Sequence, residues 1–331
     1  MHRFILLLFT IGTALTATSI FAQEGQVRNI HFDTVRTGDV QATPVGVDEM
    51  KYIGTDYISA DDSAYMRYIT RIVQRDIDFY ADFELVLVDS FYVKMYEIDE
   101  VSLLGWMRLG ATYLVRLEAE FPGKNIRVRW RLFDCARGQR FARGKLDRNR
   151  TYWRELGHDI ANEIVHTLTG EPGIFRSRIA YVRKIGKAKE IFVADYDGAN
   201  EQQLTQTGSI NISPMFAPNK DEVYFTSFMR GEPHLYKVDI FSKDITPVAS
   251  YPGIVAAATL SPDGNKIACT LSKDGNSEIY VLNLKGKVIK RLTRHKAIDS
   301  SPTWSPDGRM MAFTSDRSGT PQIYMMDSDG L

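Results

Sequence analysis

The acidic side chains most suggestive of metal binding lie in turns near the C-terminal half of the chain. Residues 195–198 read Asp-Tyr-Asp-Gly, which resembles half of a calcium-binding loop. The stretch lacks the third acidic ligand and the bidentate Glu that an EF-hand loop requires. A similar turn recurs at residues 327–330, and Asp-Gly is ordinary hairpin chemistry. The pattern therefore favours turns over a metal site, and we expect no cofactor.

Two histidines, His158 and His166, fall in one predicted helix, but eight residues apart. A helical zinc pair needs a spacing of four and a nearby carboxylate, so His158 is predicted to be a packing or surface residue. The sequence contains no Gly-x-Ser-x-Gly elbow, no phosphate-binding glycine loop and no Cys-x-x-Cys pair. We therefore predict neither catalysis nor a small-molecule substrate.

The C-terminal half of the chain, which contains the Asp-Gly turns, repeats with a period of 44 residues. Two series of strand-like segments share this offset and begin at Ile179, Val223, Ile267 and Met311, and at Ile191, Leu235, Ile279 and Ile323. A fixed period of about 40–45 residues, built from short strands and turns, is typical of a β-propeller blade. Because one blade cannot bury its own faces, function is expected on a surface that several blades build.

The turns of the repeat support this interpretation. Ser-Pro-Asp-Gly occurs at residues 261–264 and 305–308, with a degraded copy at 217–220. Pro sits at a strand end because it cannot donate to a ladder, and Asp-Gly supplies positive-φ positions. Three full blades and most of a fourth are predicted from Arg178 onward, whereas propellers close with about four to eight. An open ring leaves unpaired strand edges, so we expect a longer natural chain with about two more blades.

The first 22 residues are predicted to be a secretory signal peptide. A short basic start, Met1-His2-Arg3, precedes an apolar stretch over residues 4–20 and a cleavage site after Ala22. A transmembrane anchor is the alternative, because the stretch is near the minimum of about 17–20 residues. Its Ser and Thr residues and the absence of a basic stop favour cleavage.

Composition excludes one class of partner. The chain has 41 Lys and Arg against 41 Asp and Glu, and this zero net charge argues against nucleic-acid binding. Cys269 occupies the repeat position that Tyr181, Phe225 and Phe313 fill elsewhere, so it is predicted to be a core residue. A disulfide between Cys135 and Cys269 is disfavoured because its geometry is demanding, although an oxidising compartment would permit it.

Residues 23–172 lack the repeat and alternate helices with strands, which predicts a separate α/β domain. A helix capped within residues 61–63 has its apolar stripe at Met66, Ile69, Val73, Ile77 and Tyr80. Strands are predicted at residues 84–88, 112–119 and 125–132, and a short helix at 101–109. A last helix begins near Thr151 and ends at Gly170. Residues 173–331 then form the propeller.

A basic run crosses this domain. In the strand at residues 125–132, apolar residues alternate with arginines, and the run continues as Arg137, Arg140, Arg143, Lys145, Arg148 and Arg150. An anionic partner such as a phospholipid surface could use it. The solvated face of a one-sided sheet explains it equally well and is favoured, because such a face must be polar.

The chain resembles the TolB family over residues 27–331. The most specific match is the string at residues 158–164, followed by residues 168–170, Gly173, Phe175 and residues 178–182, which resembles the family's junction between an α/β domain and a propeller. The Ser-Pro-Asp-Gly turns and residues 314–319 are similar too, but related propellers share them, including those of prolyl oligopeptidases. The resemblance implies about six blades in a complete protein.

The resemblance implies a periplasmic scaffold of the Tol–Pal system, which supports outer-membrane integrity and cell division. The family's propeller binds the peptidoglycan-associated lipoprotein Pal, and its extreme N-terminus binds TolA of the inner membrane. Residues 27–33 resemble this TolA-binding segment through Val27, Arg28, Ile30 and Phe32. Such a segment suits strand addition to a partner's sheet. The alternative is an ordinary edge strand of its own domain.

The resemblance also places the Pal interface on loops that precede the inner strand of each blade. Here these loops hold the candidate partner-binding residues Ser209, Ile210, Asn211, Ile254, Val255, Asp299, Ser300 and Ser301. The second loop, residues 254–257, is apolar where the family is usually polar. An exposed apolar pair there would suit a protein contact. The alternative is packing against the neighbouring blade.

Three hypotheses follow. The first is the TolB-like scaffold, which is no enzyme. The second is the propeller of a prolyl-oligopeptidase-like serine peptidase whose catalytic domain lies outside this sequence; the α/β domain before the propeller weighs against it. The third is a paralogue with another envelope partner.

Overall fold

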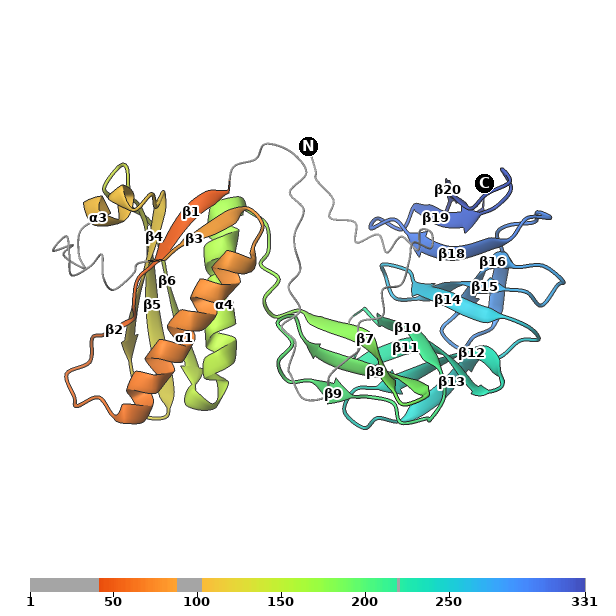
Figure 1. Cartoon of the computed structure of the whole chain (residues 1–331), viewed down its shortest axis with the longest axis horizontal. Helices are drawn as coiled ribbons and strands as arrows, with labels where there is room; N and C mark the ends of the chain where they lie inside the picture. The colour runs from red at the N-terminus through yellow and green to blue at the C-terminus, as the bar shows by residue number, and fades with distance from the viewer. Residues whose placement is uncertain (1–41, 88–102, 219–220, 331) are drawn as a thin grey trace. The chain divides into compact units, whose positions relative to one another are not determined.

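A computed structural model describes residues 42–87, 103–218 and 221–330 (Figure 1). The predicted signal peptide and the segment with Val27, Arg28, Ile30 and Phe32 lie outside these residues. Within them, no helix is both long enough and apolar enough to cross a membrane.

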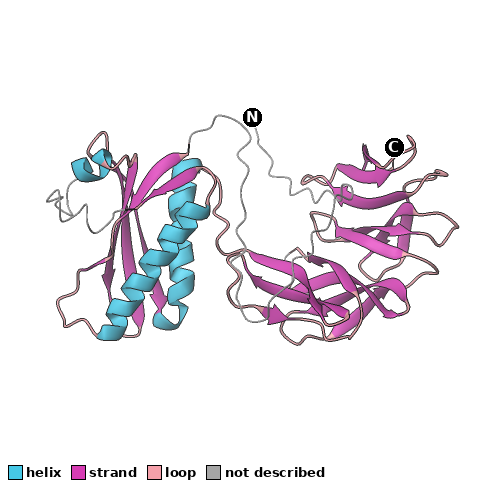
Figure 2. Cartoon of the chain, viewed as in Figure 1, coloured by secondary structure: helices cyan, strands magenta, loops and turns pink. Residues whose placement is uncertain are grey.

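The N-terminal α/β region is a six-stranded sheet with two long helices on one face (Figure 2). The strand order is β3-β1-β4-β5-β6, with β1 parallel to β3 and β4, and short β2 pairing with β4. The strands are β1 (Thr43–Val47), β2 (Lys51–Tyr52), β3 (Phe83–Val86), β4 (Tyr113–Glu120), β5 (Asn125–Asp134) and β6 (Gln139–Asn149). The helices are α1 (Ala60–Phe79), α3 (Leu103–Arg108) and α4 (Trp153–Thr169), which the 3-10 turn η1 (Arg150–Tyr152) precedes.

Helix α1 follows its predicted stripe but begins earlier than expected. The cap is Ser59, whose hydroxyl accepts a hydrogen bond from the Asp62 N–H at 3.0 Å. The predicted cap within residues 61–63 is therefore wrong. Those residues form the first turn instead, where acidic side chains favour the positive end of the helix dipole.

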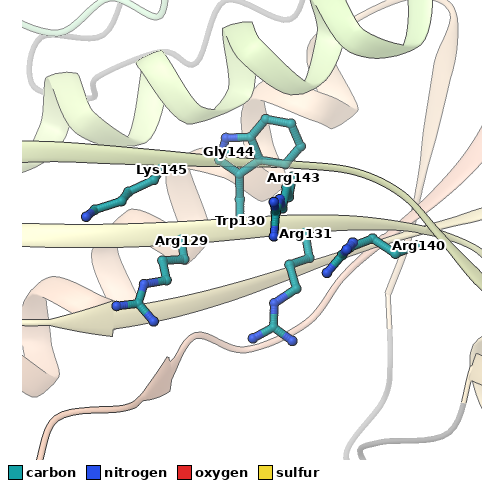
Figure 3. Close-up of a pocket in the computed structure, with 7 residues that line it drawn as sticks. All are labelled: Arg129, Trp130, Arg131, Arg140, Arg143, Gly144 and Lys145. Atoms are coloured by element: carbon teal, nitrogen blue, oxygen red, sulfur yellow. The ribbon is translucent and has the colours of Figure 1, made fainter.

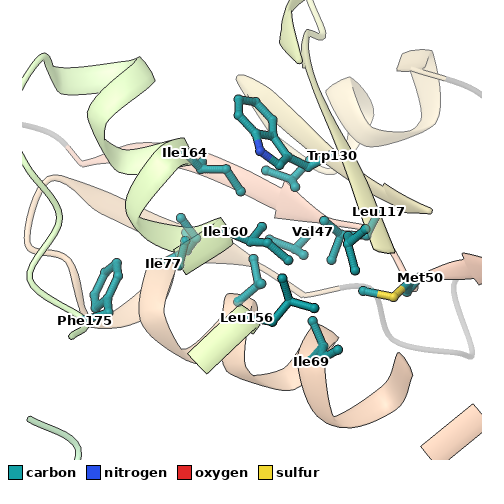
Figure 4. Close-up of a cluster of buried hydrophobic side chains, with 14 of the residues drawn as sticks. Val47, Met50, Ile69, Ile77, Leu117, Trp130, Leu156, Ile160, Ile164 and Phe175 are labelled. Carbon is teal, nitrogen blue, oxygen red and sulfur yellow. The ribbon is translucent and has the colours of Figure 1, made fainter. Parts of the chain in front are cut away.

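Helix α4 ends as predicted, because Gly170 adopts the left-handed conformation with φ of 77°. Its buried stripe packs with α1 against the sheet, and Figure 4 shows Leu156, Ile160 and Ile164 in this core. A Cβ on Gly157 would lie 2.8 Å from Cγ2 of Ile72, so a glycine permits the close approach of the two helices.

The alternation predicted for β5 is confirmed. Its apolar residues, including Val128 and Trp130, are buried beneath the helices, and its arginines lie on the other face. Strand β6 was not predicted, because exposed basic residues dominate its sequence and few apolar residues mark a buried face. The indole N–H of Trp130 donates to Glu163 of α4 at 2.6 Å, which ties this strand to the helix layer.

The C-terminal region consists of four antiparallel sheets in chain order. The first is β7 (Arg178–Ile185), β8 (Ala188–Asp195) and β9 (Gln202–Gln203). The second is β10 (Asn211–Phe216), β11 (Glu222–Arg230), β12 (Glu232–Asp239) and β13 (Ile245–Ala249). The third is β14 (Val255–Leu260), β15 (Lys266–Leu271), β16 (Glu278–Asn283) and β17 (Val288–Arg291). The fourth is β18 (Asp299–Trp304), β19 (Met310–Ser315) and β20 (Gln322–Asp327).

The four sheets agree with the predicted three to four blades, but fewer of them are complete than the predicted three full blades and most of a fourth. Two sheets have four strands, and the first and last have three. The reason is the phase of the repeat: β7 matches β11, β15 and β19, which are the second strands of their sheets. The 44-residue period itself is confirmed by the starts of these strands.

The propeller cores lie between sheets rather than within them. Val223 and Phe225 of β11 pack against β8 of the preceding sheet, whereas Tyr224 between them packs against the following sheet. The third sheet alternates in the same way: Cys269 faces the second sheet and Ala268 faces the fourth. Cys269 is thus the predicted core residue, and burial raises the pKa of its thiol to about 12.

The Ser-Pro-Asp-Gly turns form as predicted at both described copies. Gly264 and Gly308 have φ of 69° and 71°, which glycine adopts readily. The Ser261 hydroxyl donates to the Asp263 carboxylate at 2.5 Å and accepts from the Lys266 N–H at 3.0 Å. Residues 219–220 of the degraded copy lie outside the described residues.

A buried polar cluster joins the α/β core to the first propeller sheet. Asp76 of α1 contacts Nδ1 of His158 at 2.7 Å and accepts a hydrogen bond from the Tyr196 hydroxyl. Asp197 beside it binds Arg154 at 2.6 Å and also Arg75. The turn at residues 195–198, whose sequence resembles half of a calcium-binding loop, therefore binds guanidinium groups.

Burial and the charged partners together set the protonation of this cluster. Desolvation raises the pKa of the Asp76 carboxyl, although His158 and Tyr196 oppose the shift. Burial also raises the pKa of the Tyr196 hydroxyl, and the Asp76 charge adds to this. For Asp197, burial is outweighed by hydrogen bonding from Arg154 and the charge of Arg75, which hold its pKa below the ordinary value.

Replacing Tyr196→Phe is expected to destabilise the protein by about 1–3 kcal/mol, because it leaves a buried Asp76 oxygen without its donor. Urea unfolding measures the loss. Tyr57→Phe, at a side chain that is 95% exposed, is the control and is expected to change little. Equal effects of the two substitutions would contradict the role given to the buried contact.

The Asp263 carboxyl is expected to titrate near pH 2. Hydrogen bonds from the Ser261 hydroxyl and the Asn265 N–H lower its pKa to about 2 from an ordinary 3.8. Because the folded value is depressed, the stabilisation is present above about pH 4 and is lost as the pH falls through about 2.

The measurement is an NMR titration of carboxyl carbons. Ser261→Ala is expected to raise the Asp263 midpoint and to leave Asp307 in the equivalent turn unchanged. An unchanged Asp263 midpoint in that variant would refute the assignment of the shift to this turn.

Candidate functional site

The candidate site is a set of three exposed isoleucines, one before the first strand of each of three consecutive sheets. Ile210, Ile254 and Ile298 precede β10, β14 and β18 and are 42%, 43% and 53% exposed. A single exposed isoleucine is ordinary. Three at one repeat position form a pattern, which we call the isoleucine row. The first strands β10, β14 and β18 contact one another in this order, so successive members lie at the starts of neighbouring strands.

Each member of the row is followed by a strained residue in a β-bulge. Ser213, Ala257 and Ser301 have φ of 55°, 49° and 53°, and the strand register shifts at each of them. The left-handed conformation costs a residue with a Cβ about 1–2 kcal/mol. Bulges are common beside functional sites because they redirect the backbone. The recurrence of this strain indicates that the entry to each strand is held in one geometry.

The structure places the predicted site residues in two environments. Ile210, Ile254 and Ser301 are exposed, and Ser209 and Ser300 are half-buried. Asn211, Val255 and Asp299 are fully buried, so they support the loops from inside. Val255 packs in the core between the second and third sheets, as the packing alternative proposed, whereas Ile254 points outward.

Ile298 was not among the residues predicted from the sequence, because the third predicted loop began one residue later, at Asp299. The signal was present: Ile298 stands one period after Ile254 and two after Ile210.

Buried carboxylates anchor the loops of the row. Glu190 of β8 accepts hydrogen bonds from the Thr205 hydroxyl at 2.5 Å, the Asn211 side-chain amide at 2.8 Å and the Gly208 N–H at 2.8 Å. Two periods later, Glu278 of β16 accepts from the Thr293 hydroxyl at 2.5 Å.

Glu278 also accepts from the His295 N–H at 2.8 Å and from Arg291 at 3.1 Å. The carboxylate thus fixes the backbone that leads to Ile298. Asp299 adds a second anchor, because both of its oxygens accept from Arg317 at 2.9 and 3.0 Å.

The loop of Ile254 lacks this anchor. The positions equivalent to the glutamate and threonine hold His234 and Ala249, both buried. Other contacts replace the carboxylate: the Tyr251 hydroxyl donates to the Gly286 carbonyl at 2.7 Å, and the Ile254 N–H donates to the Ser272 hydroxyl at 2.8 Å. This middle loop is therefore the least charged of the three.

The row offers contact surface rather than reactive groups. Across residues 42–87, 103–218 and 221–330, no three His, Cys, Asp or Glu side chains are grouped to hold a metal. Cys135 and Cys269 are both buried free thiols. An apolar row above a rigid, hydrogen-bonded support is the arrangement expected of a protein-binding face.

The sequence matches two family models. One is described as the TolB amino-terminal domain and covers residues 34–141; the other, the TolB beta propeller domain, covers residues 165–331. The chain belongs to the TolB family. The order of the two matches agrees with the α/β region and the four-sheet region that follow each other in the structure.

Individual TolB relatives support the assignment. The chain is 29% identical over 242 residues to the Tol-Pal system protein TolB of Ruegeria sp. (strain TM1040), covering 70% of this chain and 52% of the relative. It is 30% identical over 222 residues to that of Cereibacter sphaeroides (strain ATCC 17029 / ATH 2.4.9), covering 65% and 50%. The chain thus spans about half the length of the curated relatives it matches.

A solved TolB structure agrees with the fold. The crystal structure of TolB from Acinetobacter baumannii matches 87% of this chain and 69% of its own, with a TM-score of 0.73 and 27% identity. The order of α/β region and propeller sheets is therefore that of a known TolB.

Glu278→Gln is expected to lower the free energy of unfolding by about 1–3 kcal/mol. The amide keeps the size of the side chain but turns an NH₂ group toward a buried donor. Chemical denaturation measures the change, with the exposed Glu232→Gln as the matched control. A loss no larger than that of Glu232→Gln would show that the buried carboxylate does not anchor the loop.

Proposed function

We propose that this protein is a periplasmic scaffold of a Tol–Pal system and has no enzymatic activity of its own. Membership of the TolB family supports the proposal, as do two relatives that are named Tol-Pal system proteins. Residues 1–22 act as the cleaved leader in this proposal. The domains divide between residues 172 and 173, within the string that resembles the family's junction.

The propeller partner in this proposal is a Pal-like peptidoglycan-associated lipoprotein. The observation that carries the proposal is the isoleucine row, which exposes one apolar side chain in each of three sheets. Exposed apolar side chains on a rigid support bind protein with little entropic cost, because the loops are already ordered. The exposed Ser301 and the half-buried Ser209 and Ser300 supply hydrogen-bonding groups around the row.

The second partner in this proposal is a TolA-like inner-membrane protein bound by residues 27–33. An extended segment with alternating Ile30 and Phe32 suits addition to the edge of a partner's sheet. With both partners bound, the scaffold connects the inner membrane to the peptidoglycan layer, which is how it would support outer-membrane integrity and cell division.

Ile254→Ser is expected to weaken binding of the Pal from the same organism about tenfold, because the side chain is central in the row. A loss of about 1.4 kcal/mol corresponds to this factor. The triple variant with Ile210→Ser and Ile298→Ser is expected to abolish binding at micromolar concentrations. Isothermal titration calorimetry measures both.

The control is Ile289→Ser on β17, at a side chain that is 56% exposed and lies outside the row. All variants replace exposed side chains, so their thermal stability should stay close to that of the parent. Pal binding that survives the triple substitution would refute the row as the interface, and removal of residues 27–33 should leave Pal binding intact.

A further inference from the structure

The open face of the α/β sheet carries a concentrated positive charge that the proposed function does not use. Arg129 and Arg131 of β5 and Arg140, Arg143 and Lys145 of β6 line a hollow of about 500 Å³ (Figure 3). We call these five cations the basic face. The hollow contains no acidic side chain among its lining residues. Because the whole chain has equal numbers of acidic and basic residues, this charge is a local feature.

The strand register brings like charges together on this face. Arg129 stands directly opposite Lys145, and Arg131 stands directly opposite Arg143. Like charges directly opposite each other destabilise a sheet. Neutral or opposite-charge pairs would be more stable here, so these cations are candidates for a role other than folding.

Neighbouring carboxylates compensate only the β5 side of the face. Glu118 of β4 binds Arg131, and Glu120 binds Arg129 at 3.1 Å. On β6, the described residues supply no ion pair to Arg140, Arg143 or Lys145, all of which are exposed. Within the part of the chain that the structure describes, the charge of these three side chains is therefore uncompensated.

At one end of this side of the sheet, the surface is apolar and partly exposed. Helix α3 packs there through Trp106, which contacts Gly46 and shares a core with Leu114 and Phe133. Two other side chains of α3, Leu104 and Met107, are 60% and 41% exposed. The opposite side is covered by α1 and α4, and Figure 3 shows the Trp130 indole directed away from the cations toward a helix.

We propose that the basic face binds an anionic phospholipid bilayer. Successive outward residues of a strand lie about 7 Å apart and neighbouring strands about 5 Å apart, so the cations form a two-dimensional grid. Such a grid suits the planar array of phosphates on a bilayer better than one linear acidic segment. Guanidinium groups pair with phosphate through two parallel hydrogen bonds.

The exposed residues of α3 distinguish a bilayer from a soluble phosphate. Apolar side chains beside a basic patch can enter the interfacial region of a membrane, where a free anion gives them no partner. The phospholipid surface accounts for both the charge and the apolar flank. This site is separate from the isoleucine row and does not depend on a Pal-like partner.

The test is co-sedimentation of the purified protein with vesicles of phosphatidylcholine, with and without phosphatidylglycerol. Binding is expected only with the anionic lipid and is expected to fall when salt rises from about 50 to about 500 mM, because counterions screen the attraction. Each basic residue contributes about a fivefold gain near an anionic surface. Arg143→Gln with Lys145→Gln should therefore weaken binding on the order of 25-fold.

The matched control is Arg67→Gln with Arg71→Gln, which removes the same charge from exposed positions of α1 on the other side of the domain. It should retain binding. Thermal unfolding checks that both variants fold, and the β6 variant should be at least as stable as the parent because it relieves repulsion.

Three results would overturn the proposal. One is equal binding to vesicles with and without phosphatidylglycerol. Another is an equal loss of binding in the two double variants. The third is binding of soluble polyphosphate or of an acidic peptide by a protein that does not bind the vesicles, which would assign the basic face to that ligand.

Discussion

A propeller sheet has no core of its own, and the arrangement of the C-terminal region follows from that constraint. Each sheet must bury both faces against its neighbours, so adjacent residues of one strand serve different cores. Val223 packs toward the first sheet and Tyr224 toward the third. This packing buries most strand faces, so many of the side chains that remain available to a partner lie at strand ends. The isoleucine row occupies such ends, so in the proposed function a repeat without catalytic motifs still indicates where a partner would bind.

The same constraint explains the buried carboxylates. Glu190 and Glu278 are buried beside the connections between consecutive sheets. Each accepts hydrogen bonds from one backbone N–H group and a threonine hydroxyl, and so it holds the loop before the next sheet in place. Burying a charged group is costly unless its hydrogen bonds are complete. The buried carboxylates therefore also hold the loops of the isoleucine row in place.

Much of the fold could be predicted from local patterns. Helix stripes, the alternation of β5 and the 44-residue period depend on residues close in sequence, and these predictions held. The features that were not predicted depend on contacts between residues far apart in the sequence, or lie where polar and apolar residues do not alternate. Strand β6 has almost no apolar face, so its pattern resembled a loop. The contact of Asp76 with Tyr196 joins residues 120 positions apart, which no local spacing indicates.

The candidate site was only half predicted for the same reason. The loops were located by their place in the repeat, but which side chains point outward depends on the bulge in each first strand. That bulge buries Asn211, Val255 and Asp299 and exposes the isoleucine before each of them.

The repetition of the isoleucine row has a consequence for orientation. A partner that meets the row could turn by one blade about the propeller axis and find the same side chain at nearly the same place. Apolar contacts of this kind cannot by themselves distinguish one rotational setting from the next. The supports beneath them do differ, since an anchored glutamate lies under the first and third loops and His234 under the second. In the proposed function, the least charged loop would therefore break the pseudo-symmetry and allow a partner to dock in a single angular register.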